Sequence, residues 1–342
     1  MGDYPPYTIT NKMLNYVSDI MKKIGETNYL ENVNKYPELR RKSRIKSIHS
    51  SLAIENNQLS LFQVEDVING KLVIGEQKDI QEVKNAYKAY ENIRKINPYS
   101  VEDLKKIHGI LTFLIEKDAG KFRNHGEAVY DGDVQIFVAP PHELVPKLME
   151  DLFDWLNKEK DKINPLILSS IFHYEFVFIH PFHDGNGRTA RLWQTAILSH
   201  WENLFAYLPI ESMIKKNQEK YYKVIDNCNK AGNSTEFIEF MLKMIKNAID
   251  EASKVTTQET TQETTQETAQ ETTQETTQEK MLKLIKENPT ITQVQMSKVL
   301  GITRDGISYN IKQLKEKEII EREGSNKNGK WIIKKNKKSK VK

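Results

Sequence analysis

The densest set of reactive side chains lies in twelve residues, His180-Pro-Phe-His-Asp184-Gly-Asn-Gly-Arg188-Thr-Ala-Arg191. Histidine is the usual general base near neutral pH, aspartate is a hard ligand for a divalent cation, and arginine binds phosphate oxygens. The Asp-Gly-Asn-Gly run predicts a tight turn that opens onto a helix, whose first backbone N–H groups attract anions. Because Arg188 and Arg191 are three residues apart, we expect both to point toward the same anion. The segment therefore predicts a phosphate-handling site with His180 as base and Asp184 as metal ligand.

Two other interpretations are open for this segment. The glycines and arginines would also suit an ordinary turn followed by a solvated helix face. A zinc site made of His180, His183 and Asp184 is the other alternative, but no further ligand has a recognisable metal spacing. His183 is assigned no role. The coincidence of base, acid, glycines and arginines favours the phosphate site.

The segment resembles the signature of the Fic family, His-x-Phe-x-Asp/Glu-Gly-Asn-Gly/Lys-Arg-x-x-Arg, at every defined position. The resemblance implies a helical core that transfers AMP from ATP to a Ser, Thr or Tyr hydroxyl of a target protein or of the chain itself. It implies that His180 is the general base, that Asp184 binds Mg²⁺, and that Phe182 is a core anchor. The ATP-phosphate ligands that it implies are Gly185, Asn186, Gly187, Arg188 and Arg191. Gly187, where Doc-type phosphotransferases carry Lys, favours AMP transfer.

A second pattern of the same family lies upstream, in Ser51-Leu-Ala-Ile-Glu55-Asn56. It resembles the inhibitory pattern Ser/Thr-x-x-x-Glu-Gly/Asn. On a helix Ser51 and Glu55 share a face, and Asn56 suits the helix end. The resemblance implies that Glu55 pairs with Arg191 and keeps ATP from a productive pose. The alternative is an exposed carboxylate on a helix.

Two further segments gain a meaning from the resemblance. An Asp-Gly pair between two β-prone runs, within residues 128–138, predicts a hairpin. In Fic proteins a hairpin flap captures the target by strand pairing, which would involve Val134, Gln135, Ile136 and Phe137; a structural edge ribbon is the alternative. Downstream, Tyr221, Tyr222 and Asn229 resemble nucleotide-pocket residues, and Asn217 is a weaker candidate. Core packing is a rival explanation for the tyrosines.

Charge and repeats divide the chain. Residues 280–342 carry 17 Lys and Arg against 6 Asp and Glu, whereas the whole 342-residue chain has a net charge of +4. Residues 256–279 are six copies of Thr-Thr-Gln-Glu, with Ala269 as the single departure. This polar repeat cannot form a core, and Thr disfavours helix, so we expect a flexible coil. The predicted domains are an N-terminal helical region (1–95), a catalytic core (96–250), a linker (251–279) and a basic C-terminal domain (280–342).

The expected fold is mainly α: a Fic helical core with a β-hairpin flap, followed by a winged helix-turn-helix domain. The apolar run from Ile163 to Ile179 predicts a buried helix. Three helices are expected after residue 280, and Thr292-Gln-Val-Gln295 has the form of a capping box that opens the second of them. Two strands should follow around a Gly/Asn/Ser loop. DNA is the expected partner of this end. The predicted DNA contacts are Arg304, Ser308, Tyr309 and Lys312, with lysines of the wing and tail on phosphates. Protein docking or dimerisation is the alternative use of such a domain.

Composition limits the remaining possibilities. The single cysteine, Cys228, forms no internal disulfide, and no apolar run is long enough to cross a membrane. We therefore expect a soluble, cytoplasmic protein. A nucleotide-sensing transcriptional regulator and a Fic enzyme that removes AMP are the alternative functions. The sequence leaves the target and the oligomeric state, including a homo-oligomer, open.

Overall fold

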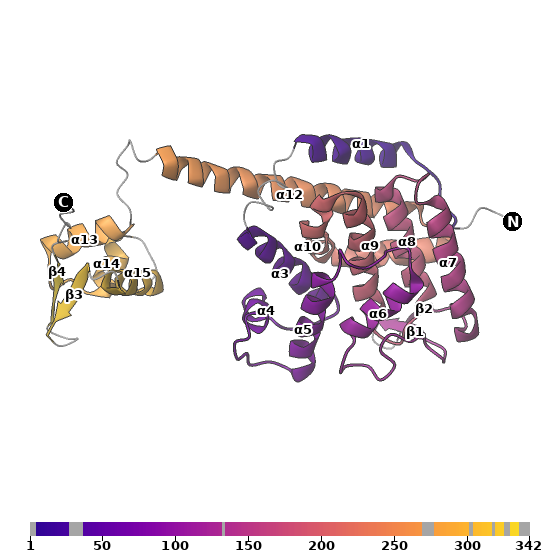
Figure 1. Ribbon diagram of the computed structural model, residues 1–342, viewed down its shortest axis with the longest axis horizontal. Helices are drawn as coiled ribbons and strands as arrows, with labels where there is room; N and C mark the ends of the chain where they lie inside the picture. The colour runs from indigo at the N-terminus through magenta and orange to yellow at the C-terminus, as the bar shows by residue number, and fades with distance from the viewer. Residues whose placement is uncertain are drawn as a thin grey trace, which may run out of the picture. The chain divides into compact units, whose positions relative to one another are not determined.

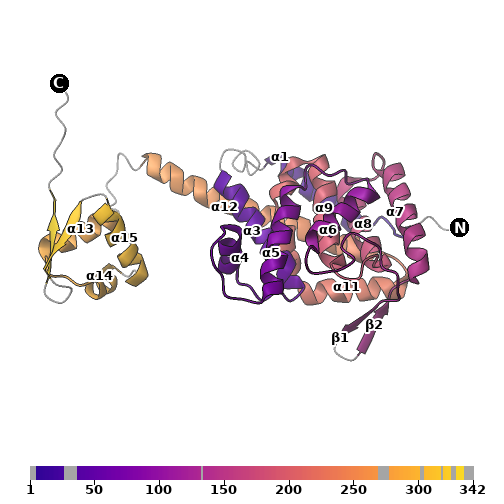
Figure 2. The ribbon, with the colours of Figure 1, turned by 60° about the horizontal axis from the view of Figure 1, so that its bottom comes forward.

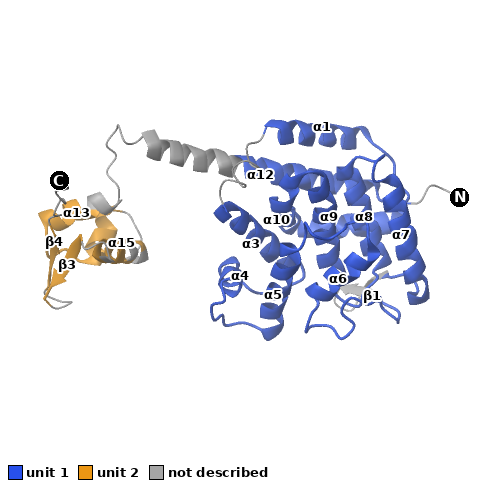
Figure 3. Cartoon of the chain, viewed as in Figure 1, with its two compact units in different colours: residues 1–259 blue, residues 260–342 orange. Residues whose placement is uncertain are grey.

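The computed structural model describes residues 5–26, 37–131, 134–268, 277–300, 304–316, 319–324 and 329–334. For residues 128–131, 134–137, 254–268, 277–280, 304–305, 309 and 316 it describes the backbone alone. The chain divides into two compact units, residues 1–259 and 260–342 (Figure 3). The predicted boundary between residues 95 and 96 falls inside the first unit, so the packing does not divide the chain there.

Two antiparallel helices form the centre of the first unit. Helix α8 (Pro165–Ile179) is apolar on nearly all sides, as expected of a helix surrounded by protein, and it packs on α9 (Asn186–Trp201). The Asn164 side chain caps α8 by accepting from the Leu166 N–H at 3.0 Å, and Pro165 occupies its first turn. The predicted buried helix is confirmed. The short connection between α8 and α9 holds the signature segment.

The other helices of the first unit surround this pair (Figure 1). They are α1 (Asn11–Glu26), α3 (Pro37–Ile54), α4 (Leu61–Ile68), α5 (Gln77–Glu91), α6 (Val101–Leu111), α7 (Val145–Glu159), α10 (Ile210–Lys216), α11 (Gln218–Ala231) and α12 (Thr235–Thr268), with 3₁₀ turns at His142–Leu144 and Asn203–Tyr207. Helix α1 lies along α12, where Lys12 pairs with Glu239. Helix α3, which carries the predicted inhibitory pattern, packs on α10, α5 and α9.

A two-stranded hairpin protrudes from the helices (Figure 2). Strands β1 (Ala128–Asp131) and β2 (Val134–Val138) pair antiparallel, with a register irregularity between Val129 and Tyr130. The predicted hairpin is present at the predicted place. Its turn residues, Gly132 and Asp133, lie outside the described part of the chain, as do the side chains of Val134, Gln135, Ile136 and Phe137.

The repeat segment differs from the expected coil over its first half. Helix α12 continues from the apolar core, where Phe237, Met241 and Ile245 are buried, to Thr268 within the repeat. Nucleation is the costly step of helix formation, whereas each added residue contributes one hydrogen bond. A helix already anchored in a core can therefore extend into Gln- and Glu-containing sequence despite its threonines. The division between the two units falls inside this helix.

The second unit has the predicted winged-helix order. Its elements are α13 (Thr277–Glu287), α14 (Gln293–Leu300), α15 (Arg304–Glu316), β3 (Ile320–Glu323) and β4 (Lys330–Ile333). Met281, Met296, Ile307 and Trp331 are buried in its core, and the Trp331 indole donates to the Ile291 carbonyl at 3.0 Å. The predicted capping box before α14 is present: the Gln295 N–H donates to Thr292 Oγ1, and the Thr292 N–H donates to Gln295 Oε1.

None of the helices that the structure describes is long and apolar enough to cross a membrane.

Replacement of Thr292 by Ala should destabilise the second unit by about 1 kcal/mol, because the first turn of α14 loses its cap. Calorimetry of the full chain should show a lower melting temperature for the transition of this unit. Thr292→Ser, which retains the hydroxyl, is the matched control. Equal melting of Thr292→Ala and the unaltered chain would contradict the capping role.

Candidate active site

His180 terminates α8 in the left-handed conformation, with φ 51°, which turns the chain away from the helix axis. The backbone here is held by Arg123, a buried side chain from the loop before β1. Its Nε donates to the His180 carbonyl at 2.7 Å, and its other nitrogens donate to the carbonyls of His125 at 2.9 Å and Pro140 at 2.5 Å. Burial is the main cause that lowers the pKa of His180, so the imidazole is neutral at pH 7 and able to accept a proton.

The backbone of the loop after His180 is held by hydrogen bonds from side chains, which are called clasps below. The Asn186 side chain accepts from the Phe182 N–H at 3.0 Å and donates to the Phe182 carbonyl at 2.8 Å. The buried Phe182 ring stacks on His108 of α6, with 3.6 Å between the centroids and 7° between the planes. Phe182 is thus an anchor. The Asn186 side chain, predicted among the phosphate ligands, is occupied by this clasp, so it is the backbone of Asn186 that remains for an anion.

His108 has a defined tautomer. Its Nδ1 accepts from the Gly120 N–H at 2.9 Å, so Nε2 carries the proton that is donated to the Asp184 carbonyl at 2.8 Å. Gly120 can approach this closely because it has φ 81° and no side chain; a Cβ there would lie 2.9 Å from the Lys105 carbonyl. Burial is the main cause that lowers the pKa of His108 to about 4. The neutral ring therefore holds the backbone of the predicted metal ligand.

The first turn of α9 faces the loop with its backbone N–H groups. Gly185 precedes the helix with φ 78°, and its N–H donates to Asp184 Oδ1 at 2.6 Å. Burial alone would raise the pKa of Asp184, but the Arg188 guanidinium and the Gly185 amide hold it below its ordinary value. Asp184 is consequently ionised at neutral pH, with its side chain 38% exposed and open to an incoming cation.

Arg188 and Arg191 do not point toward one anion in this structure, contrary to the expectation from their spacing. Arg188 is buried between two carboxylates, at 2.8 Å from Glu82 Oε1 and 2.9 Å from Asp184 Oδ2. Glu82 comes from α5, more than 100 positions earlier in the chain, and also accepts from the Asn57 amide at 2.9 Å. A buried guanidinium needs a partner, and α5 supplies one that residue spacing could not reveal.

Arg191 is paired with the predicted inhibitory segment. It donates to Glu55 Oε1 at 2.7 Å, to the Ser51 hydroxyl at 3.1 Å and to the Ser51 carbonyl at 3.0 Å. Burial would lower the pKa of Arg191, but the Glu55 carboxylate outweighs it and raises the value. The carboxylate rests directly on Gly187, where a Cβ would lie 2.3 Å from Glu55 Oε1. A carboxylate thus occupies the anion-attracting start of α9.

The end of α3 is held from the far side of the site. Lys215 donates to the Ala53 carbonyl at 2.7 Å, and the Gln218 amide and the Tyr222 hydroxyl donate to the Ile54 carbonyl at 3.0 and 3.3 Å. These donors satisfy carbonyls that a helix C-terminus leaves without partners, and a lysine is favourable there. Asn56 has φ 66°, as expected for a residue that ends a helix. The chain then reverses toward α4.

The predicted nucleotide-pocket residues lie in different environments. Tyr222 is half-exposed beside Glu55, whereas Tyr221 is buried and its hydroxyl contacts His173 at 3.0 Å, as core packing predicted. Asn229 accepts from the Tyr174 hydroxyl of α8 at 2.9 Å. Asn217 donates to the Met213 carbonyl at 2.9 Å and joins α10 to α11. Both tyrosines therefore interact with the Glu55–Arg191 pair, but only Tyr222 is exposed beside it, whereas Tyr221 is enclosed in the core.

Sequence reasoning missed three residues that position the site. Arg123 and Glu82 have partners far away in the chain, and no local pattern distinguishes them. His108 had a usable signal: it follows Leu104 and Ile107, which are spaced by three residues as on one apolar helix face, so it lies at the edge of that face. A histidine in such a place is commonly a buried hydrogen-bonding residue, which is what the structure shows.

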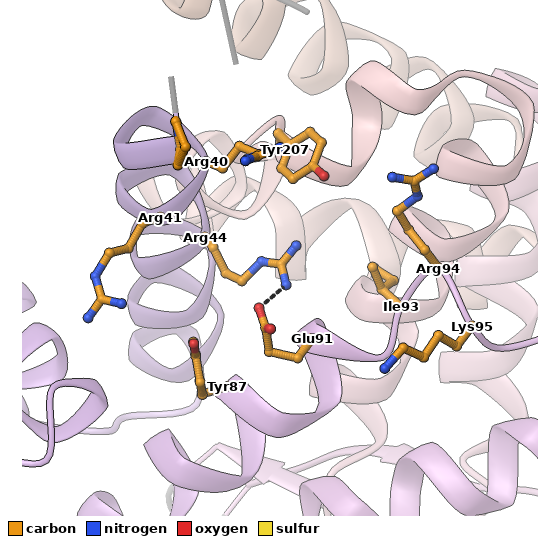
Figure 4. Close-up of a pocket in the computed structure, with 10 residues that line it drawn as sticks. Arg40, Arg41, Arg44, Tyr87, Glu91, Ile93, Arg94, Lys95 and Tyr207 are labelled. Atoms are coloured by element: carbon orange, nitrogen blue, oxygen red, sulfur yellow. Dashed lines mark hydrogen bonds and ion pairs between the residues drawn. The ribbon is translucent and has the colours of Figure 1, made fainter. Parts of the chain in front are cut away.

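A basic pocket of about 510 Å³ lies apart from this site, between the first half of α3 and the end of α5 (Figure 4). Five of its lining side chains are cationic: Arg40, Arg41, Arg44, Arg94 and Lys95. Arg44 is bonded to Glu91 at 2.5 Å and to the Tyr90 carbonyl at 3.0 Å. No residue of the signature lines the pocket, so it is separate from the anion site at α9.

In the second unit, the predicted DNA contacts lie on α15. Ser308 and Lys312 are exposed on this helix. Arg304 and Tyr309 also belong to α15, but their side chains are outside what the structure describes, as are the lysines after residue 334.

Comparisons with known proteins agree with this geometry. A Fic/DOC family model matches residues 98–198, and a winged helix-turn-helix DNA-binding model matches residues 274–321. A crystal structure of a Fic family protein from Desulfovibrio desulfuricans G20 is 38% identical, with a TM-score of 0.71, over 98% of this chain and 100% of the other. The chain belongs to the Fic family. The family and fold predicted from the sequence are thereby confirmed.

More distant relatives have names that state an activity. A protein adenylyltransferase Fic of Nematostella vectensis is 29% identical over 219 residues, which cover 61% of this chain and 49% of the relative. Fic-1 of Caenorhabditis elegans, a protein adenylyltransferase, is 29% identical over 69% of this chain. A structure of the latter has the same fold, with a TM-score of 0.62 at 23% identity, over 72% of this chain and 73% of the other. The chain spans about half the length of the curated relatives it matches.

Acid should weaken the fold through His108. The pKa of this imidazole is near 6.5 when unfolded and about 4 when folded, so below pH 6.5 the unfolded chain binds more protons. Relative to His108→Gln, the unaltered chain should lose about 1.4 kcal/mol of unfolding free energy per pH unit as the pH falls from about 6 to 4.5.

Urea unfolding of both proteins across this pH range measures that difference. His142→Gln, which alters a half-buried surface histidine, is the control and should follow the unaltered chain. Parallel pH profiles for His108→Gln and the unaltered chain would disprove a neutral buried His108.

Proposed function

We propose that this protein is a self-inhibited protein adenylyltransferase that transfers AMP from ATP to a hydroxyl side chain of a target protein or of itself. The observation that carries the proposal is the juxtaposition of a neutral His180, the ionised Asp184 and the anion-attracting start of α9. The names of the curated relatives, protein adenylyltransferases at about 29% identity, support the same reaction.

The proposed reaction forms one P–O bond and breaks another. The target hydroxyl attacks the α-phosphorus of ATP, His180 accepts the hydroxyl proton, and the bond between the α-phosphorus and the β-bridging oxygen breaks to release pyrophosphate. The backbone N–H groups at the start of α9 would face the phosphates, together with Arg191 once Glu55 has left it. Tyr222, at the edge of the same space, is the proposed nucleotide contact.

The residues present suit a magnesium-bound nucleotide. Mg²⁺ in such sites is typically held by one or two carboxylates together with substrate phosphates, and it neutralises charge on those phosphates. Asp184 would supply the carboxylate, because it is ionised, partly exposed and fixed by His108, Gly185 and Arg188. The Glu55 carboxylate lying on Gly187 supports the view that an anion fits this surface.

Glu55 is the proposed inhibitor. It takes the Arg191 guanidinium and covers Gly187, so a nucleotide phosphate cannot use either while it is there. Strand pairing along the β1–β2 hairpin, through residues 134–137, is the proposed mode of target capture.

Replacing Glu55 with Gly should raise AMP transfer roughly tenfold or more, because a charge-assisted hydrogen bond of about 1.5–3 kcal/mol no longer competes with ATP. Incubation with ATP labelled at the α-phosphate, followed by mass spectrometry of the chain and of lysate proteins, measures the transfer. His180→Ala should abolish labelling in either background.

Glu38→Gly, which removes an exposed carboxylate from the first turn of the same helix, is the matched control and should leave labelling unchanged. Unaltered labelling after Glu55→Gly would refute the inhibitory role. Glu55-dependent release of AMP from a labelled protein would favour the removal reaction instead.

We further propose that the second unit binds DNA through α15. The match to a winged helix-turn-helix DNA-binding model and the exposure of Ser308 and Lys312 on α15 support this. The net charge of +11 in residues 280–342, from 17 basic and 6 acidic residues, would favour a polyanion.

If Lys312 contacts a phosphate, Lys312→Ala should weaken DNA binding and reduce the slope of log K against log salt by about 1. Fluorescence anisotropy of duplex DNA at several salt concentrations measures both quantities. Lys158→Ala, an exposed lysine of the first unit, is the control. Identical salt slopes for Lys312→Ala and the unaltered chain would exclude Lys312 from the interface.

The same assay also tests the alternative function. If His180→Ala still binds DNA and no variant shows labelling activity, a transcriptional regulator would be favoured over an enzyme.

A further inference from the structure

Among the residues that the structure describes, three metal-binding donor atoms converge beside the signature loop: those of His125, Glu127 and His183 lie within 4.8 Å of one another. His125 Nε2 is 3.2 Å from His183 Nδ1 and 3.0 Å from a Glu127 carboxylate oxygen. That oxygen is 2.5 Å from His183 Nδ1. Two imidazoles and a carboxylate thus face one point, although His183 is 56 and 58 positions from the other two.

The backbone around all three residues is held in place. Arg123 donates to the carbonyls of His125 and His180, so one buried side chain fixes both loops at this point. The backbone carbonyl of Glu127 accepts from the Ala139 N–H at 3.0 Å, and this bond closes the base of the hairpin.

On the other loop, His183 lies between two clasped neighbours. The preceding residue, Phe182, is held by the Asn186 side chain, and the carbonyl of the following residue, Asp184, accepts from His108. The three donors are therefore preorganised, and a ligand would not have to order either loop.

The donor set selects a class of cation. Zn²⁺ and similar divalent transition metals bind imidazole nitrogen and carboxylate oxygen, often with three protein ligands and an open position. Mg²⁺ and Ca²⁺ prefer oxygen ligands and would gain little from two imidazoles. His125 and His183 are half-exposed, so a metal can enter from solvent, whereas Glu127 is more shielded.

We propose that His125, Glu127 and His183 form a binding site for a divalent transition metal of the Zn²⁺ class, distinct from the carboxylate of Asp184. A metal there would join the base of the β1–β2 hairpin directly to the signature loop. Its binding would stabilise the two loops against each other whether or not the chain transfers AMP.

Zn²⁺ titration of the full chain tests the site. After removal of metals with a chelator, equilibrium dialysis with elemental analysis should find one Zn²⁺ per chain in the absence of nucleotide, with Mg²⁺ in excess failing to displace it. His125→Ala and His183→Ala should each weaken binding by about tenfold or more, since one of three protein ligands is lost. Co²⁺ should give a visible absorption spectrum that the same variants lose.

Two controls separate this site from others. His142→Ala removes a histidine outside the cluster, and Asp184→Ala removes the neighbouring carboxylate; both should retain Zn²⁺. Loss of Zn²⁺ in Asp184→Ala with retention in the histidine variants would overturn the proposal, as would binding unchanged in all variants or no binding to the unaltered chain.

The metal-free folds of the histidine variants are compared by thermal melting. The milder His125→Gln and His183→Gln replace either variant that melts early, and they should lose Zn²⁺ in the same way. Retention of Zn²⁺ by folded Gln variants would also overturn the site.

Discussion

The positive end of the α9 dipole is the constraint around which the first unit is arranged. Two carboxylates from different parts of the chain lie at this end: Asp184 accepts from the Gly185 N–H, and Glu55 rests on Gly187. Two arginines from the first turns of the helix form ion pairs with these carboxylates: Arg188 with Asp184, and Arg191 with Glu55. Four charges this close require fixed geometry, because a buried charge that loses its partner is expensive.

The supporting contacts meet that requirement by connecting distant elements. Glu82 joins Arg188 to Asn57, two residues beyond Glu55, so α5 links the signature to the end of the segment that carries Glu55. Behind α3, the buried Glu211 of α10 accepts from Ser47 at 2.9 Å and from Tyr90 at 2.7 Å. Burial is the main cause that raises the pKa of Glu211. These polar contacts fix α3 in rotation as well as in position, so that the Glu55 side chain points toward Arg191.

Local patterns in the sequence predicted the features that depend on neighbouring residues. The capping box at Thr292, the hairpin at residues 128–138, the helix before His180 and the signature turn each follow from side chains a few positions apart. The ion pair between Glu55 and Arg191 spans 136 positions and was predicted only because the family pattern carries both residues.

Contacts that depend on the tertiary fold could not be predicted in this way. Arg188 is turned toward Glu82 by the packing of α5, so its spacing from Arg191 was misleading. Arg123 holds four residues through backbone carbonyls, which have no sequence signature. The extension of α12 into the repeat depends on a helix started elsewhere, a cooperative effect that residue propensities do not include.

The hydrogen bonds that hold the last turn of α3, together with the ion pair of Glu55 and Arg191, have a thermodynamic consequence. An anion that takes the Arg191 N–H groups must displace Glu55, so the two occupants exclude each other. Linkage makes this exclusion symmetric: any event that loosens the last turn of α3 raises the affinity for the anion, and the anion loosens that turn by the same factor. By the same linkage, the hydrogen bonds from Lys215 and Gln218 to the Ala53 and Ile54 carbonyls would lower the affinity for an anion at Arg191, because they stabilise the turn that carries Glu55. The free energy that couples the stability of this helix end to anion binding is one quantity, and it can be measured from either process.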